Sequence, residues 1–477
     1  MPKTLIAAAA AGLLFAAAAA GEAPDLQTRK TGSDWPTFLG PTGDGKSPET
    51  GVLLRWPADG PPLRWHVGAG EGYSMASVAA GRLFFFDRDG DNARLRCLSS
   101  ETGDELWRAE YPSAYEDYYG YSTGPRASPV VDGERVYTLG VEGILRAYRV
   151  EDGKLLWTVD TSDRYSVVQN FFGVGSTPVV EGDLLIVPVG GSPPGSPKVH
   201  TGEVKGNGTG IVALDKLTGA EKYRLGDELA SYATPALVTL DGRRWGFHFA
   251  RGGLMGFDPV AGKLEFFYPW RSKVVESVNA ANPVVVGDTV FITETYGPGS
   301  SLLRINPGGY EVLWKDPRRP QAMASHWSTP IYHQGHLYGS SGRNSGQAQL
   351  RCIDHRSGEV EWSQPGLSRS TLLYVDGHFI VLTEYGRLLV IEATPEAYRP
   401  LSELDLGAAS GASGPEPDSA AKEPLPEAPA NGDGPPRLRY PAWNAPILAH
   451  GLLYVRGRDR LICLDLAGKG PGYGANE

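Results

Sequence analysis

Short apolar runs separated by turn residues recur along most of the chain. In residues 128–157, four β-rich runs are separated by turns at 132–133, 140–143 and 151–154, and each turn contains glycine. Glycine-containing turns between runs rich in Val, Leu and Tyr predict a four-stranded antiparallel meander. Such a sheet has two apolar faces, so it requires a neighbouring sheet on each side.

The same unit recurs with a long period. Residues 129–137, 178–186 and 283–291 read PVVDGERVY, PVVEGDLLI and PVVVGDTVF and align without a gap. The proline that opens the inner strand recurs at spacings of 49, 57, 48 and 47 residues, at Pro129, Pro178, Pro235, Pro283 and Pro330. An aromatic residue closes most units, at Trp65, Trp107, Trp157, Tyr223, Phe266, Trp314 and Trp362. This period is typical of β-propeller blades, in which large side chains fill the outer gap between diverging sheets.

The two ends of the repeat region are incomplete units. Residues 63–65 read like the last strand of a blade without the preceding three, whereas residues 445–466 supply three strands and no closing aromatic. We therefore predict an all-β fold, an eight-bladed β-propeller of four-stranded antiparallel blades that is closed by an N-terminal strand completing the C-terminal blade. The other blades begin near Tyr73, Arg126, Gly175, Tyr232, Asn279, Trp327 and Arg369. Because the seventh, in residues 372–404, lacks a closing Trp, six or seven blades remain alternatives.

Two segments precede the repeats, residues 1–23 and 24–61, and neither has the strand and turn pattern of a blade. Residues 1–23 contain Lys3, an apolar run and then small residues, which predicts a signal peptide and an exported, periplasmic or extracellular protein. No other segment approaches the length of a membrane span. Residues 24–61 are predicted to form an extended segment that wraps an outer surface, with Trp35 and Phe38 as anchors.

The propeller itself is predicted to occupy residues 62–477, with two interruptions. Residues 190–210 lengthen a hairpin of the third blade. Residues 407–439 are rich in Pro, Ala, Gly and Glu, and this composition predicts a disordered insertion between the seventh and eighth blades.

Charge and cysteine usage narrow the range of partners. The net charge of -10 argues against nucleic acid or an anionic membrane as the main partner. Cys97, Cys352 and Cys463 occupy the same register as Ala147 and Ala213, which indicates small buried strand positions and not disulfides. We expect a soluble monomer.

Several motifs together resemble a known repeat. A TG-type turn precedes Leu-Trp in residues 101–107 and recurs in 215–219, beside strands that end in Leu-Asp. This pattern resembles the pyrroloquinoline-quinone (PQQ)-type repeat of quinoprotein alcohol dehydrogenases and of the outer-membrane assembly lipoprotein BamB, both of which are eight-bladed. The resemblance covers roughly residues 62–470. The opening Trp35-Pro36 further looks like secreted repeat proteins of this superfamily that have no assigned activity.

The resemblance to dehydrogenases implies PQQ and Ca²⁺ on the axis, above two adjacent cysteines. No two cysteines are adjacent here, the family's metal-binding Glu, Asn and Asp and its catalytic Asp fall on no matching motif, and a haem-attachment CxxCH is missing. A PQQ-dependent dehydrogenase is therefore retained only as the alternative function, and the preferred interpretation has no catalytic residue, metal or cofactor.

Other catalytic and metal-binding motifs are weaker. No GxSxG or HExxH occurs. His333 and His336 fall at a hairpin turn, which favours surface turn residues over a metal site. Residues 87–92 cluster carboxylates, but a solvated hairpin is favoured over a Ca²⁺ loop because no downstream Glu follows.

The segments that precede the inner strands carry the remaining chemistry. We expect their residues to converge on one end of the axis and to form a funnel, made of Glu71, Tyr73, Tyr121, Arg126, Phe172, Tyr232, Asn279, His326, Trp327, Arg369, Trp443 and Asn444. Aromatic side chains with Arg, His and Asn are typical of recognition surfaces. The sequence thus predicts a non-catalytic scaffold that binds a protein or polymer partner in the cell envelope. An equally weighted alternative is that these residues plug the axis and cap strand ends.

Overall fold

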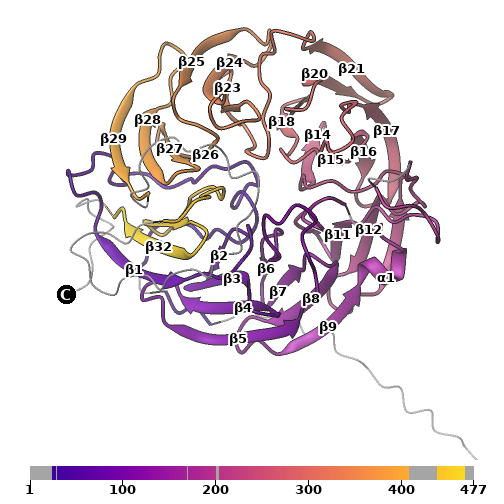
Figure 1. Ribbon diagram of the computed structural model, residues 1–477, viewed down its shortest axis with the longest axis horizontal. Helices are drawn as coiled ribbons and strands as arrows, with labels where there is room; N and C mark the ends of the chain where they lie inside the picture. Colours follow the sequence, from indigo (N-terminus) through magenta and orange to yellow (C-terminus); the bar gives the residue numbers. More distant parts are fainter. Residues whose placement is uncertain (1–23, 28, 169, 200–202, 408–437, 468–477) are drawn as a thin grey trace, which may run out of the picture.

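Eight four-stranded antiparallel sheets radiate from one axis and close into a ring (Figure 1). The computed structural model describes residues 24–27, 29–168, 170–199, 203–407 and 438–467. This arrangement confirms the all-β propeller and excludes the alternatives of six and seven blades. Within the described residues the one α-helix is α1 (Thr161–Tyr165), and no helix has the length and hydropathy needed to cross a membrane.

The first four blades follow chain order, each from the axis outward. Blade one contains β2 (Ser77–Ala79), β3 (Arg82–Asp89), β4 (Asn92–Ser99) and β5 (Glu105–Pro112). Blade two contains β6 (Val130–Asp132), β7 (Arg135–Leu139), β8 (Ile144–Arg149) and β9 (Leu155–Asp160). Blade three contains β10 (Val179–Glu181), β11 (Leu184–Pro188), β12 (Ile211–Asp215) and β13 (Glu221–Leu225). Blade four contains β14 (Ala236–Leu240), β15 (Arg243–Phe249), β16 (Gly253–Asp258) and β17 (Lys263–Pro269).

The remaining blades repeat the pattern until the last, whose outer strand comes from the N-terminal side. Blade five contains β18 (Val284–Val286), β19 (Thr289–Glu294), β20 (Gly299–Asn306) and β21 (Gly309–Lys315). Blade six contains β22 (Ile331–His333), β23 (His336–Ser341), β24 (Gln349–Asp354) and β25 (Val360–Pro365). Blade seven contains β26 (Ser370–Val375), β27 (His378–Thr383), β28 (Arg387–Glu392) and β29 (Pro400–Asp405). Blade eight contains β30 (Ile447–Ala449), β31 (Leu452–Arg456), β32 (Arg460–Asp465) and β1 (Leu63–Gly68).

The closing aromatic residue of each unit joins one blade to the next. Trp107 of blade one lies opposite Cys97 in its own sheet. Its indole Nε1 donates to the Val150 carbonyl oxygen of blade two at 2.9 Å. Its ring lies on Gly153, where a Cβ would approach the indole to 2.5 Å and where φ is 71°. The glycine of the turn before Leu-Trp is therefore required both for its backbone conformation and for this contact.

The same joint recurs around the ring. Indole Nε1 atoms donate to carbonyl oxygens of the following blade from Trp65, Trp157, Trp314 and Trp362. Tyr223 makes the equivalent bond through its hydroxyl to Pro259. Phe266 has no donor and packs instead against Tyr310, with ring centroids 5.0 Å apart.

The three cysteines occupy the small inner positions opposite these aromatic residues. Cys97 pairs with Trp107, Cys352 with Trp362 and Cys463 with Trp65. All three are free and buried, as predicted. Burial raises the pKa of the Cys97 and Cys352 thiols to about 12, so they remain protonated at neutral pH.

Ring closure follows the prediction. β1 pairs antiparallel with β32, from Leu63 opposite Leu464 to Gly68 opposite Arg460. Trp65 on β1 then donates from its indole to Ser100 of blade one at 3.0 Å. The donated strand thus completes blade eight and joins it to blade one (Figure 1).

The segment before β1 crosses the end of the axis, so the expectation that it wraps an outer surface was wrong. Trp35 forms a bridge to Val78 of blade one and is 1% exposed. The Pro36 carbonyl accepts from the Val131 amide of blade two at 2.8 Å, and Lys46 bridges to Tyr374 of blade seven. The inner strands leave backbone groups unpaired toward the axis, and this segment satisfies several of them.

The end of the same segment fills the gap left by the missing aromatic of blade seven. Ser402 occupies the closing position, opposite Val390. Its hydroxyl accepts from the Trp56 amide at 2.9 Å and donates to the Leu54 carbonyl oxygen at 2.8 Å. Leu54 is buried between blades seven and eight in one hydrophobic cluster. The N-terminal segment therefore replaces a side chain that the repeat lacks.

Two predicted features fall mainly on residues that are not described. The signal peptide, 1–23, lies outside the described residues, as do residues 408–437 of the insertion 407–439. At its two ends, Gly407 and Leu438 form a β-bridge, and the Leu438 amide donates to Leu406 at 2.6 Å. The lengthened hairpin of the third blade lies between β11 and β12.

The hairpin at residues 87–92 is exposed at its turn, residues 89–91, as expected, but Asp87 is not part of the solvated loop. The Asp87 side chain is fully buried and accepts from Arg94 at 2.9 Å and from Arg96 at 3.0 Å. Burial raises the pKa of Asp87, but the two guanidinium groups outweigh it and hold the pKa below its usual value. Arg94 and Arg96 are two residues apart on β4, so their side chains lie on the same face of the sheet. Both therefore reach the carboxylate of Asp87 on the neighbouring strand β3 of the same hairpin.

Replacing Trp65 tests the joint between blades eight and one. Trp65→Phe keeps a six-membered aromatic ring but loses the indole donor and part of the ring volume, so the free energy of unfolding is expected to fall by about 1–2 kcal/mol. Trp65→Ala also empties the space over Gly103 and is expected to cost about 3–5 kcal/mol. Urea denaturation of both variants measures these losses, and equal losses in the two would contradict the role assigned to the ring.

Replacing His248 tests a buried imidazole in blade four. His248 is fully buried, neither ring nitrogen has a partner among the described residues, and burial lowers its pKa to about 3. The equivalent positions hold Phe85 and Ile292, so His248→Ile is expected to stabilise the protein by about 1–3 kcal/mol.

The effect should depend on pH. Unfolded His248 binds a proton below about pH 6.5 while the folded residue stays neutral, so wild-type stability falls as the pH drops through this range. Thermal unfolding between pH 5 and 7.5 is expected to show a weaker acid dependence in His248→Ile. Parallel curves for the two proteins would show that the imidazole is not the cause.

Candidate functional site

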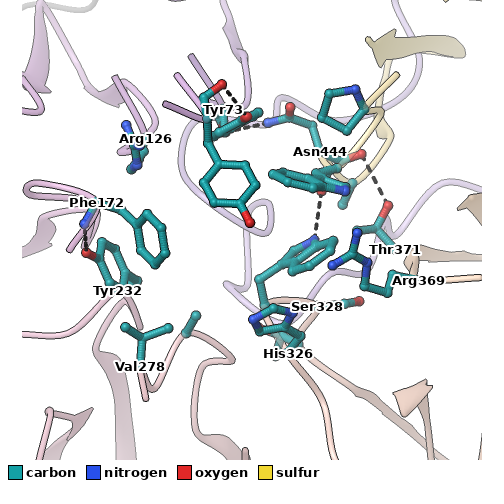
Figure 2. A pocket seen from close by; sticks show the side chains of 18 of the residues that line it. Tyr73, Arg126, Phe172, Tyr232, Val278, His326, Ser328, Arg369, Thr371 and Asn444 are labelled. Atoms are coloured by element: carbon teal, nitrogen blue, oxygen red, sulfur yellow. Dashed lines mark hydrogen bonds between the residues drawn. The ribbon is translucent and has the colours of Figure 1, made fainter. Parts of the chain in front are cut away.

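A cavity of about 680 Å³ lies on the axis, at the end of the ring where the inner strands begin (Figure 2). Phe38 and Leu39 of the N-terminal segment are among its lining residues, together with the starts of the inner strands. Since that segment bridges blades one, two and seven below the opening, the axis forms a cup with its mouth at the opposite end.

Ten of the twelve residues predicted for the funnel line this cavity. They are Tyr73, Tyr121, Arg126, Phe172, Tyr232, His326, Trp327, Arg369, Trp443 and Asn444. Glu71 and Asn279 do not line it. Glu71 instead accepts from the Thr123 amide at 2.7 Å, and the buried Asn279 side chain donates to the Ala250 carbonyl oxygen at 2.8 Å. These two residues hold loops and strand ends in place.

The lining aromatics form a continuous belt of ring contacts. Trp327 and Trp443 lie with ring centroids 4.9 Å apart, and the Trp327 indole donates to the Trp443 carbonyl oxygen at 3.2 Å. Trp443 also contacts Tyr73, at 5.0 Å between centroids. Across the cavity, Phe172 packs against Tyr232 at 5.8 Å and donates its amide to the Tyr232 hydroxyl at 2.8 Å. Figure 2 shows Tyr73, Phe172 and Tyr232 around a common space.

Arg126 is held by its own loop. Its guanidinium donates to Asp117 at 2.9 Å, to the Gly124 carbonyl oxygen at 2.9 Å and to the Ser122 carbonyl oxygen at 3.1 Å. The Asp117 side chain is fully buried, so the pair lies within the wall. Arg126 therefore organises the loop that carries Tyr121, which agrees with the alternative of structural capping for this residue.

Arg369 is similarly fixed, between two indole rings. It donates to Glu384 Oε2 at 2.7 Å, and its guanidinium carbon lies 5.0 Å from the Trp327 ring and 5.4 Å from the Trp443 ring. The Trp443 indole donates to the same Glu384 oxygen at 3.1 Å. A buried charge pair between aromatic faces sets the orientation of both tryptophans.

One histidine and two tyrosines of the wall, His326, Tyr296 and Tyr73, are neutral at physiological pH. Burial, together with Arg369 and Arg343, lowers the pKa of His326 to about 3. Its Nε2 is 2.8 Å from the Tyr296 hydroxyl, and burial raises the pKa of that phenol to about 12. Burial likewise raises the pKa of Tyr73 to about 12. The charge of the cavity therefore comes from its arginines and from Glu276.

Several lining residues were not predicted because they come from another set of loops. Tyr296 follows β19, Arg343 follows β23, and Arg458 lies between β31 and β32. In each blade the turn between the second and third strands opens at the same end as the start of the inner strand. Applying this alternation to the repeat would have identified them, whereas Phe38 had no such signal.

Two of these missed residues carry charges that no described carboxylate neutralises. Arg343 and Arg458 are exposed, and among the described residues neither has an acidic group within ion-pair distance. The Arg343 guanidinium lies over the Tyr296 ring, 4.6 Å from its centroid. Glu276 is the one carboxylate in the described lining.

The two histidines at the blade-six turn lie where the innermost strand β22 ends, whereas the cavity lies where the inner strands begin, and neither lines the cavity. His333 and His336 face each other across the turn between β22 and β23, where the gap-free alignment placed them. His336, Asp354 and Glu361 place one potential ligand atom each within 4.8 Å of one another. The Asp354 carboxylate already accepts the amides of its own turn, at 2.9 and 2.7 Å.

Comparisons with known proteins agree with the repeat pattern. The family described as outer membrane protein assembly factor BamB matches residues 54–193 and 191–364, which is more than half of the chain. No curated protein matched the sequence.

Solved structures share the architecture. BamB from Moraxella catarrhalis is 13% identical, with a TM-score of 0.54 over 86% of this chain and 99% of that one. The quinohemoprotein alcohol dehydrogenase from Comamonas testosteroni is 12% identical, with a TM-score of 0.60 over 93% of this chain and 82% of that one. The enzyme ADHIIG from Pseudomonas putida HK5 is 12% identical, with a TM-score of 0.58 over 92% and 81%. At these identities the likeness establishes the fold alone.

Replacing Tyr232 tests the wall on the blade-three side. Tyr232→Phe leaves the Phe172 amide without its acceptor, so the free energy of unfolding is expected to fall by about 1 kcal/mol. Tyr121→Phe serves as the control because Tyr121 is exposed, and a change within about 0.5 kcal/mol is expected. Chemical denaturation measures both, and equal effects would contradict the assigned hydrogen bond.

Proposed function

Because the chain belongs to the family described as outer membrane protein assembly factor BamB, we propose that it is a non-catalytic scaffold that binds a partner through the axial cup. The partner is a protein or polymer of the cell envelope. The observation that carries this proposal is a cavity of about 680 Å³ whose walls combine an aromatic belt with unneutralised arginines.

Exposed aromatic side chains extend this surface beyond the cavity. Tyr118, Tyr119 and Tyr121 are 62, 39 and 51% exposed on one side of the mouth. Tyr385, 45% exposed, stacks on the cavity-lining Tyr440 with centroids 5.1 Å apart. Tyr and Arg are enriched in protein interfaces. Exposed apolar side chains that form one contiguous patch, as these tyrosines do around the mouth, mark interaction sites, whereas singly scattered ones do not.

The proposed compartment follows from the N-terminal sequence and the family. Residues 1–23 have the composition of a secretory signal, and the family is described by a role at the outer membrane. We place the protein in the periplasm or outside the cell, as a soluble monomer without a nucleic-acid partner.

A PQQ-dependent dehydrogenase is the alternative, favoured by the similarity to quinohemoprotein alcohol dehydrogenases and by the axial position of the cavity. The lining residues fit this cofactor pair poorly. Cys97, Cys352 and Cys463 lie in separate sheets opposite the closing aromatics, and none lines the cavity. Ca²⁺ prefers several carboxylate and carbonyl oxygens, whereas the described lining offers Glu276 and four arginines.

Site-specific photo-cross-linking in the native envelope tests the scaffold proposal. A photoreactive phenylalanine analogue at Tyr121 is expected to give a discrete adduct, because this side chain is exposed at the cavity mouth. The matched control is Leu106, which is 44% exposed on the outer strand β5.

The same adduct from both positions, or from neither, would contradict the proposal. A second measurement addresses the alternative: the purified protein with added PQQ and Ca²⁺ is expected not to reduce an electron-acceptor dye with simple alcohols. Dye reduction above the level without protein would favour the dehydrogenase.

A further inference from the structure

The shape of the cup limits how a partner can enter it. Phe38 and Leu39 line the inner end, where their segment is anchored by backbone bonds to blades one, two and seven. A polymer therefore cannot thread through the axis past these residues without displacing the segment. The cavity suits a chain end or a short turn that enters and leaves by the mouth.

The charges of the cup are asymmetric. Arg343 and Arg458, which no described carboxylate neutralises, come from blades six and eight, with Arg369 of blade seven between them. The opposite wall is formed by Phe172 and Tyr232, which are apolar toward the cavity. Since eight blades form the ring, these two groups of residues face each other across the axis. Arg126, at the start of blade two, is paired with Asp117, and Glu276 lies between blades four and five.

The unneutralised arginines are suited to carboxylates. Arg369 is already engaged by Glu384, so the available donors are the guanidinium groups of Arg343 and Arg458. Arg343 lies over Tyr296, which orients the guanidinium without using its hydrogen-bond donors. An arginine fork binds a carboxylate through two parallel hydrogen bonds.

The balance of charge in the described lining favours an anionic ligand over a cation, because two arginines without a described acidic partner stand against one carboxylate, Glu276. His326 and Tyr296 stay uncharged at neutral pH and bond to each other, so they add no negative potential. The exposed Tyr118, Tyr119 and Tyr121 at the mouth extend the surface beyond what a small molecule would touch. These features together match the recognition of acidic peptide motifs by arginine clusters beside aromatic anchors.

We propose that the cup binds a short acidic segment of a partner polypeptide, with its carboxylates on Arg343 and Arg458 and an adjacent apolar or aromatic side chain against Phe172 and Tyr232. This inference rests on the proposed function and names the chemistry of the partner. Because the arginines are exposed at the mouth, binding should weaken as salt concentration rises.

Selection from a random heptapeptide display library against the purified full chain tests this inference. Peptides that combine Asp or Glu with Phe, Tyr or Trp are expected to be enriched. An enriched peptide is then synthesised with Glu or with Gln at its acidic positions, and binding is measured by calorimetry. The Gln peptide is expected to bind at least tenfold more weakly.

Three protein variants make the result specific. The double variant Arg343→Ala, Arg458→Ala is expected to bind the acidic peptide at least tenfold more weakly than wild type does and to bind the Gln peptide with unchanged affinity. Arg55→Ala is the control, because Arg55 is exposed, lacks an ion pair with any described residue and lies outside the cavity lining. A variant without residues 408–437 removes a stretch whose five acids between residues 416 and 433 could compete.

Three outcomes would overturn the inference: enriched peptides without acidic residues, equal binding to wild type and the double variant, or no enrichment on either the full chain or the shortened variant. The Tyr121 cross-link separates this from failure of the scaffold proposal. If the adduct persists in the double variant, the cup binds a partner but not through an acidic segment. If no adduct forms in wild type, the scaffold proposal itself fails.

Discussion

The outer gap between neighbouring blades is the constraint on which the rest of the structure depends. Flat sheets that radiate from an axis diverge, and an aromatic ring packed on a glycine of the next blade fills the space that opens. The indole hydrogen bond to the following blade sets the distance between sheets, as for Trp107 and Val150. Because each blade is complete only when its neighbour is present, the ring has to close on itself.

The N-terminal part of the chain completes this ring in three ways. β1 supplies the outer strand of blade eight, Leu54 and Trp56 fill the gap beside blade seven, which lacks a closing aromatic, and Phe38 and Leu39 line the inner end of the axis. The same chain segment that stabilises the ring therefore gives the axial cavity a single mouth. In this way the requirement for closure also determines the side on which the cavity opens.

Much of the architecture could be predicted from the repeat, because a period of similar length with the same turn residues leaves one way to pack the sheets. The alignment placed Cys97 and Cys463 at small buried strand positions, in the register of Ala147 and Ala213, without any structural information. The course of residues 24–61 could not be predicted, since Trp35 marks a buried position but not the face on which it lies. Asp87 was misjudged because its partners, Arg94 and Arg96, follow the turn and were not considered together with it.

The site was predicted only in part for a related reason. Sequence position identified side chains that precede inner strands, such as Tyr232 and Trp327, but not whether they bond within the wall, as Arg126 does. It missed Arg343, which follows β23 and remains available. Burial and pairing decide that difference, and both depend on neighbouring blades.

Native-state hydrogen exchange followed by mass spectrometry tests the central claim, that the N-terminal segment is an integral part of the closed ring. Peptides that cover residues 35–47 and β1 are expected to exchange as slowly as those from β31, because they can open only when the ring opens. Rapid exchange of both regions while β31 stays protected would contradict the account.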